Sequence, residues 1–223
     1  MSSEASRVIQ GSVCGHSDLG RGPSIYALDV ISVLRLDAGA DHEGSLSRAI
    51  ADAVQAALSP TQVRRRDLAA DPLPPVDGAW VRDAFSAAPN VGSGPGLAVS
   101  DEVIDELVAA DVLLISSPIY NLGVPAPLKG WIDQMVRLGR TFGMNGDELV
   151  PLLDGIRAIV VVAAGGTEID GPDDFATPYL RRVLEFVGID RVDVIPVMDR
   201  GQGPDTAVAD AMPIIAAAAA ASS

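Results

Sequence analysis

The amino-acid sequence predicts an α/β protein, built on a doubly wound parallel sheet with helices on both faces. Two observations carry this prediction. Short apolar, β-branched segments alternate along the chain with longer segments whose apolar residues recur at helical spacing. The short segments lack the polar–apolar alternation of a sheet with one face in water, so both faces must be covered. With 223 residues, the chain has the length of one domain.

Five segments are predicted as the strands of this sheet. Four are dominated by apolar residues, whereas the second carries three successive arginines, Arg64 to Arg66, and is typical of an edge strand. These arginines suit an anion site, but a solvated edge that blocks aggregation is the favoured interpretation. In chain order the segments are Asp29–Leu36, Thr61–Leu68, Val112–Ser116, Ile156–Ala163 and Val192–Val197.

Helices are predicted between the strands from their start and stop residues. Ser100 is predicted to cap a helix, with Asp101 in the first turn, where the helix dipole favours negative charge. Further along, Asp133 and Arg137 are four residues apart and are predicted to pair on a helix surface. The predicted helices are residues 45–58, 100–110, 127–137 and 177–188, with a short helix at 80–85 inside a long connection, 70–96.

Charge and cysteine usage exclude several classes of protein. Thirty acidic against sixteen basic residues give a net charge of −14, which disfavours DNA, RNA and anionic membranes as partners. No apolar run approaches the roughly 18 residues of a membrane helix, and the polar amino terminus lacks the pattern of a signal peptide. One cysteine and two histidines leave little material for a metal centre, so none is predicted. A cytoplasmic protein is expected.

The two ends of the chain are predicted to lie outside the folded body. Residues 1–28 are polar and rich in Gly and Ser, and are predicted to be a flexible extension. Cys14, His16 and Asp18 lie close together there, but a mobile segment supplies no fixed geometry for a metal. The body is predicted to span residues 29–212, followed by an Ala-rich tail at 213–223.

Three of the predicted strands end in distinctive loops. In an open doubly wound sheet, ligands bind beyond the carboxyl ends of the strands. The first loop, Asp37–Ser47, runs into a helix whose first amides, with the Ser45 and Ser47 hydroxyls, suit a phosphate group. The second, Pro118–Asn121, suits a flat heteroaromatic ligand, and the third, Ala163–Gly166, lets a ligand approach the backbone. Singly, each loop is more typical of a plain turn, but together they predict a ligand site.

Longer motifs indicate a family. They are Arg66-Asp-Leu-Ala-Ala-Asp-Pro-Leu-Pro, Ser100-Asp-Glu-Val-Ile-Asp-Glu-Leu, Ser117-Pro-Ile-Tyr-Asn, Leu128-Lys-Gly-Trp-Ile-Asp, Gly171-Pro-Asp-Asp and Thr177-Pro-Tyr-Leu. On these motifs the chain resembles the FMN-dependent NADH azoreductases and quinone reductases, over about Val30 to Gly203. The resemblance implies a flavodoxin-like fold with a five-stranded parallel sheet.

The resemblance also implies a function. Such proteins are homodimers with FMN at the subunit interface, and they pass a hydride from NADH or NADPH through the flavin to a quinone or azo compound. No catalytic side chain is expected, because the flavin carries the chemistry. Phe142 would border the flavin cavity. By position, the FMN phosphate would be held by Ser45, Leu46 and Ser47, the ring flanked by Pro118, Ile119, Tyr120 and Asn121, and its pyrimidine side contacted by Ala163, Ala164, Gly165 and Gly166.

The first loop departs from the family pattern. Relatives often continue with Ser-Ser-Pro-Arg-Gly after its aspartate, whereas this chain has Ala38 to His42, with Asp41 at the arginine position. Glu43 adds a second carboxylate. A lost charged hydrogen bond costs about 1.5–3 kcal/mol. A carboxylate about 6 Å from the phosphate costs about 2–3 kcal/mol more. The third loop offers only backbone at Ala163 and Ala164, so two of the three flavin contacts are weakened.

Three functions therefore remain open. The favoured one is an FMN-dependent NAD(P)H oxidoreductase. The second is an enzyme of the same fold that has lost its flavin and acts on a small metabolite, with Asp41, His42 and Tyr120 as acid–base candidates. The third is a non-catalytic dimeric partner protein. Uptake of FMN by the purified protein separates the first from the other two.

Overall fold

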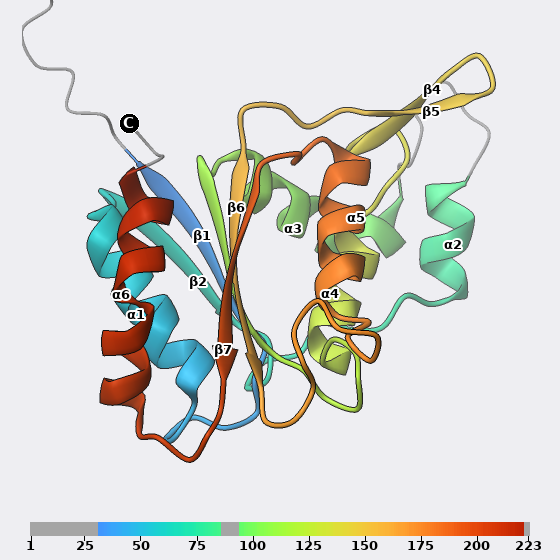
Figure 1. Ribbon diagram of the computed structural model, residues 1–223. Coiled ribbons are helices and arrows are strands. Elements are labelled where there is room, and N and C mark those ends of the chain that lie inside the picture. The colour runs from blue at the N-terminus through green and yellow to red at the C-terminus, as the bar shows by residue number, and fades with distance from the viewer. Residues whose placement is uncertain (1–30, 86–93, 221–223) are drawn as a thin grey trace, which may run out of the picture.

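The protein is built around a five-stranded parallel sheet (Figure 1). The computed structural model describes residues 31–85 and 94–220. The strand order is β2-β1-β3-β6-β7, and every neighbouring pair is parallel. All five predicted strands are confirmed, and the second lies at the edge as expected. The strands are β1 (Ser32–Asp37), β2 (Gln62–Asp67), β3 (Val112–Pro118), β6 (Arg157–Ala164) and β7 (Val192–Met198).

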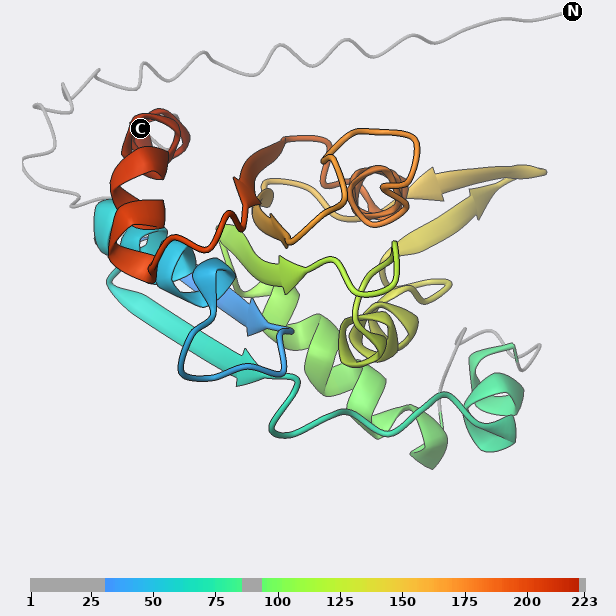
Figure 2. The same ribbon diagram turned by 60° about the horizontal axis from the view of Figure 1, so that its bottom comes forward.

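Helices cover both faces of the sheet, as the apolar strands require (Figures 1 and 2). One face packs against α1 (Leu46–Leu58) and α6 (Pro204–Ala220). The other packs against α3 (Ala98–Val108), α4 (Ala126–Met135) and α5 (Thr177–Val187). A short helix, α2 (Gly78–Ala84), and a 3-10 turn, η1 (Pro95–Leu97), belong to the long connection after β2. The predicted doubly wound, flavodoxin-like architecture is confirmed.

A long helix and a hairpin are missing from the sequence prediction. Helix α6 continues to Ala220, so the predicted boundary at residue 212 falls inside a helix. Ile215 and Ala218 of the supposed tail are buried against the sheet and α1, because the Ala-rich sequence allows close helix packing. The second element is an antiparallel hairpin, β4 (Phe142–Asn145) and β5 (Glu148–Pro151). The predicted extension at residues 1–28, with Cys14, His16 and Asp18, lies outside the described residues.

One glycine is required by the packing of α5 against the segment after the hairpin. Gly188 ends α5 with φ +106°. A Cβ atom there would lie 2.1 Å from the Leu153 carbonyl oxygen. Glycine alone meets both the left-handed backbone and the close approach.

The ion pairs differ from the sequence prediction. Lys129, not Arg137, pairs with Asp133 one helical turn away. Arg137 is buried and reaches Asp101 of α3 at 2.5 Å. The edge arginines are also paired across elements, since Arg66 contacts Glu106 of α3 and Arg65 contacts Asp37 of β1 at 2.6 Å. They are therefore fixed structural cations as well as a charged edge.

Candidate functional site

The carboxyl ends of β1, β3, β6 and β7 enclose one cleft of about 220 Å³, at the end of the sheet that comes forward in Figure 2. It joins loops that are far apart in the sequence. Of the eleven predicted site residues, Asn121 and Gly166 do not line the cleft. Nine do: Ser45, Leu46, Ser47, Pro118, Ile119, Tyr120, Ala163, Ala164 and Gly165.

The first wall of the cleft is the start of α1. Ser45 is the N-cap residue, and its Oγ accepts a hydrogen bond from the Arg48 amide at 3.3 Å. The Ser45 and Ser47 hydroxyl oxygens lie 3.2 Å apart. The amides of Leu46 and Ser47 occupy the first two helical positions, which have no acceptor within the helix. Two hydroxyls and two amides without an intrahelical acceptor therefore lie at the start of α1, where the helix dipole favours an anion.

Arg48 holds this wall in place from behind. Its guanidinium donates to the Gly39 carbonyl at 2.7 Å and to both Asp67 carboxylate oxygens at 2.7 and 2.9 Å. The Asp67 carboxylate raises the pKa of Arg48, and hydrogen bonding to Arg48 lowers the pKa of Asp67 to about 2. Next to this pair, the buried Asp37 carboxylate is contacted by Arg35 at 3.1 Å and by Arg65 at 2.6 Å. The loop rests on a charge-compensated network.

The two acids of the first loop are placed differently from each other. Asp41 lines the cleft, and its Oδ1 accepts hydrogen bonds from the amides of Glu43 at 3.0 Å and Gly44 at 3.3 Å. These amides lower the pKa of Asp41, which is therefore a carboxylate at neutral pH. Glu43 does not line the cleft, and neither does His42, whose Nδ1 lies 3.4 Å from Asp67. Of the two acids of this loop that were expected beside a phosphate, Asp41 lines the cleft and Glu43 does not.

The second wall is a tight turn after β3. Tyr120 and Gly123 exchange backbone hydrogen bonds of 3.0 and 3.1 Å around Asn121 and Leu122, whose φ angles are +49° and +70°. Asn121 tolerates this left-handed conformation, so it shapes the turn rather than facing the cleft. The Tyr120 hydroxyl accepts a hydrogen bond from the Ala40 amide at 3.2 Å, which ties the second wall to the first.

The third wall is backbone at the end of β6. The Ala163 carbonyl accepts from the Ile119 amide at 2.8 Å, so the second and third walls are also joined. A Cβ atom on Gly165 would meet no other atom within 4 Å, which leaves this stretch of backbone accessible to a ligand. Because the Ala163 and Ala164 carbonyls already accept hydrogen bonds, the backbone around Gly165 is the part of this wall most open to a flat, polar-edged molecule.

Asp199 is a lining residue that sequence reasoning missed. It follows β7 directly, its amide donates to the Ala164 carbonyl at 2.8 Å, and its Oδ1 accepts from the Gly201 amide at 2.9 Å. Asp199 was predictable, because it directly follows the predicted last strand, whose carboxyl end must reach the same edge of the sheet as the other strands.

The described lining residues are suited to binding a ligand and not to side-chain catalysis. They include serine and tyrosine hydroxyls, two carboxylates and exposed backbone, without a histidine, cysteine or lysine that would act as a base or nucleophile. A ligand that brings its own reactivity fits such a cleft better than a reaction that depends on protein side chains.

Comparison with known proteins agrees with this geometry. Residues 32–220 match the family model described as flavodoxin-like fold. The FMN-dependent NADH:quinone oxidoreductase of Thiobacillus denitrificans (strain ATCC 25259 / T1) is 46% identical over 176 residues, 76% of this chain and 84% of that protein. The FMN-dependent NADH:quinone oxidoreductase 1 of Jannaschia sp. (strain CCS1) is 42% identical over 177 residues, 78% of this chain and 92% of that protein.

The solved structures show the same fold. An azoreductase from Bacillus anthracis str. Sterne superposes with a TM-score of 0.73 at 24% identity, covering 86% of this chain and 99% of that one. The strand order and the serine-capped start of α1 agree with this similarity. The chain therefore belongs to the family of FMN-dependent NADH:quinone oxidoreductases with a flavodoxin-like fold.

Proposed function

We propose that this chain binds FMN in the cleft and transfers two electrons from NADH or NADPH to a quinone or an azo compound. The observation that carries the proposal is the convergence of three distant loops, with a serine-capped helix start in one wall and exposed backbone in another. The relatives named as FMN-dependent NADH:quinone oxidoreductases support the same reaction.

The residues of the first wall fit the phosphate of FMN. The Ser45 and Ser47 hydroxyls and the amides of Leu46 and Ser47 supply hydrogen-bond donors at the positive end of the α1 dipole. Arg48 does not line the cleft, and it acts as a positioning residue by fixing the Gly39 carbonyl against Asp67. Because these donors are already in place, an anion binds without the entropy cost of ordering the loop.

The second and third walls fit the isoalloxazine ring. Pro118, Ile119 and Tyr120 provide apolar and aromatic surface, and Ala163 to Gly165 provide backbone groups for the polar edge of the ring. When bound, FMN supplies the hydride chemistry. The chain's part is to hold the ring, set which face is open to the nicotinamide and the acceptor, and exclude water from the other face.

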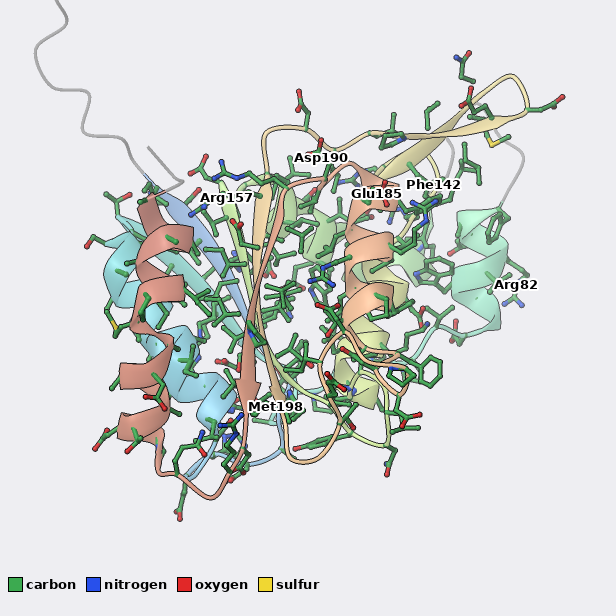
Figure 3. The ribbon with its side chains drawn as sticks, in the orientation of Figure 1. Arg82, Phe142, Arg157, Glu185, Asp190 and Met198 are labelled. Carbon is green, nitrogen blue, oxygen red and sulfur yellow. The ribbon has the colours of Figure 1, made fainter. Side chains whose placement is uncertain are left out.

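We further propose a homodimer. The cleft of one subunit, about 220 Å³, is smaller than the 300–1,000 Å³ typical of ligand sites, which favours a second subunit as the missing cover. The hairpin β4–β5 projects from the body (Figure 1), and its Met144 and Leu149 side chains are exposed. Phe142 packs against Phe186 at 5.0 Å, at the end of the sheet opposite Met198 and the cleft (Figure 3). It can border a flavin only if that flavin belongs to a second copy.

The proposed location is the cytoplasm, with small molecules as the reaction partners. The net charge of −14 disfavours nucleic acids and anionic lipids. None of the helices in the described part of the chain has the length and apolar character needed to cross a bilayer.

An absorbance titration tests the proposal. The purified chain is mixed with FMN and then titrated with NADH or NADPH under anaerobic conditions. We expect saturable binding at micromolar FMN and bleaching of the flavin band, followed by its return on addition of a quinone. A chain that stays dimeric but binds no FMN would overturn the proposal and favour either a flavin-independent metabolite enzyme or a non-catalytic partner protein.

A further inference from the structure

The charge lining the cleft is the wrong sign for a phosphate. Among the described residues that line it, the charged side chains are Asp41 and Asp199, with no lysine or arginine. The Arg48 guanidinium behind the first wall is already engaged by Asp67 and by the Gly39 carbonyl. Hydroxyls and amides are therefore the groups available to offset the repulsion.

Asp41 also occupies donors that an anion would use. Its Oδ1 accepts from the Glu43 and Gly44 amides, two of the backbone donors just before Ser45. Its other oxygen lies 3.1 Å from the position of a Cβ atom on Gly44, so the carboxylate is folded over the loop. The side chain thus satisfies the turn internally, much as a bound anion would.

The second acid is placed elsewhere. Asp199 follows β7, which is separated from β1 by β3 and β6 in the sheet. Its Oδ1 accepts from the Gly201 amide. Asp41 and Ser45, in contrast, belong to one loop after β1, and Asp41 is the acid that shares the phosphate's proposed surroundings.

We propose that Asp41 is a specificity-determining residue that removes most of the preference for the 5′-phosphate, so that the cleft accepts riboflavin nearly as well as FMN. This inference rests on the proposed flavin site. Two unit charges about 6 Å apart, at an effective dielectric constant of about 20, change an equilibrium by about 100-fold, and solvent around the exposed Asp41 side chain lowers this figure. That repulsion equals what one or two hydrogen bonds to a charged group contribute. Asp41 also occupies the Glu43 and Gly44 amides, so together these effects offset most of what the donors at the start of α1 contribute.

Two variants separate charge from hydrogen bonding. Asp41→Asn keeps an oxygen that can accept from the Glu43 and Gly44 amides but removes the charge. Asp41→Ala removes the charge and frees both amides. Glu43→Gln is the matched control, because it changes the net charge by the same amount two residues away on a side chain that does not line the cleft.

The experiment is a pair of fluorescence titrations of the full chain, with riboflavin and with FMN, at low and high salt. For the unmodified chain we expect dissociation constants within about 10-fold of each other, and FMN binding that tightens as salt screens Asp41. We expect Asp41→Asn to tighten FMN binding by at least about 10-fold and Asp41→Ala by at least as much. Riboflavin binding should change by less than about 3-fold in both, and Glu43→Gln should change either flavin by less than about 3-fold.

The failures of the two proposals are distinguishable. Absence of binding by either flavin, in every variant, overturns the proposed function and this inference together. A chain that binds FMN more than about 100-fold more tightly than riboflavin overturns the inference alone. Equal effects of Asp41→Asn and Glu43→Gln on the dissociation constant of FMN would also overturn the inference alone. The salt dependence uses the unmodified chain, so the inference stays testable even if a variant folds poorly.

Discussion

The two halves of the cleft are held by different forces. The phosphate half, residues 39–48, depends on side chains: Arg48 bridges the Gly39 carbonyl and Asp67, and Asp41 caps two amides. The ring half, residues 118–123 and 163–166, depends on backbone hydrogen bonds between its loops and on a turn with two successive left-handed residues. The phosphate half should therefore respond to charge and pH, and the ring half to backbone conformation.

The largest effect is expected from Arg48→Ala. Removing the buried guanidinium leaves the Gly39 carbonyl without its donor and leaves Asp67 with hydrogen bonds from backbone amides. This should lower the free energy of unfolding by about 2–3 kcal/mol, given that Asp67 is partly exposed. The loop should loosen as well, weakening FMN binding by at least about 30-fold. Urea unfolding and FMN titration measure the two losses.

Arg66→Ala is the matched control. Arg66 is also mostly buried, and it pairs with Glu106 and Glu102 on α3, away from the cleft. The Arg66→Ala substitution should lower the free energy of unfolding by a similar amount and leave the affinity for FMN unchanged. Equal losses of FMN affinity in both variants would mean that Arg48 acts through general stability, not by positioning the phosphate half.

Acid should weaken the phosphate half through Asp67. Hydrogen bonding to Arg48 lowers its pKa to about 2 from 3.8, so the folded state holds the charged form more strongly than the unfolded chain does. This contribution, about 1–2 kcal/mol after allowance for partial exposure, is complete above about pH 4 and is lost as the pH falls towards 2. The measurement is the difference in unfolding free energy between the unmodified chain and Asp67→Asn at several pH values. A difference that stays constant from pH 6 to pH 2.5 would contradict this linkage.

The sequence predicted the elements and the loops of the site because both depend on local patterns. Apolar runs located four of the five strands, and the run of arginines indicated the edge strand. The carboxyl ends of the strands then located three walls of the cleft. Helix α6 was missed because its alanines resemble a frayed tail, and only their packing against α1 shows that they belong to the body. The hairpin after α4 was missed because its strands are short and end in the polar turn around Gly146.

Long-range side-chain pairing could not be predicted. Arg48 and Asp67 are 19 residues apart, on α1 and at the end of β2, so their contact arises only once the helix has packed onto the sheet. For the same reason the spacing rule wrongly paired Asp133 with Arg137, whose partner is on another helix. The acidic loop was visible in the sequence, but not that Asp41 accepts hydrogen bonds from the Glu43 and Gly44 amides while Glu43 does not line the cleft.

The smallest effect is expected in the ring half, from Leu122→Gly. Leu122 has φ +70° and is 42% exposed, so glycine relieves backbone strain and gives up little burial. Offset by the greater freedom of glycine in the unfolded chain, the net gain in unfolding free energy should be about 0.5 kcal/mol.

Ser59→Gly is the matched control, because Ser59 is left-handed too (φ +46°) but ends α1 outside the cleft. Both variants should be slightly more stable in urea. Only Leu122→Gly should weaken FMN binding, by about 3-fold, since a looser turn holds Tyr120 less firmly against the ring. If both variants bind FMN like the unmodified chain, the conformation of this turn does not position the ring, and the ring half depends on the β6 backbone alone.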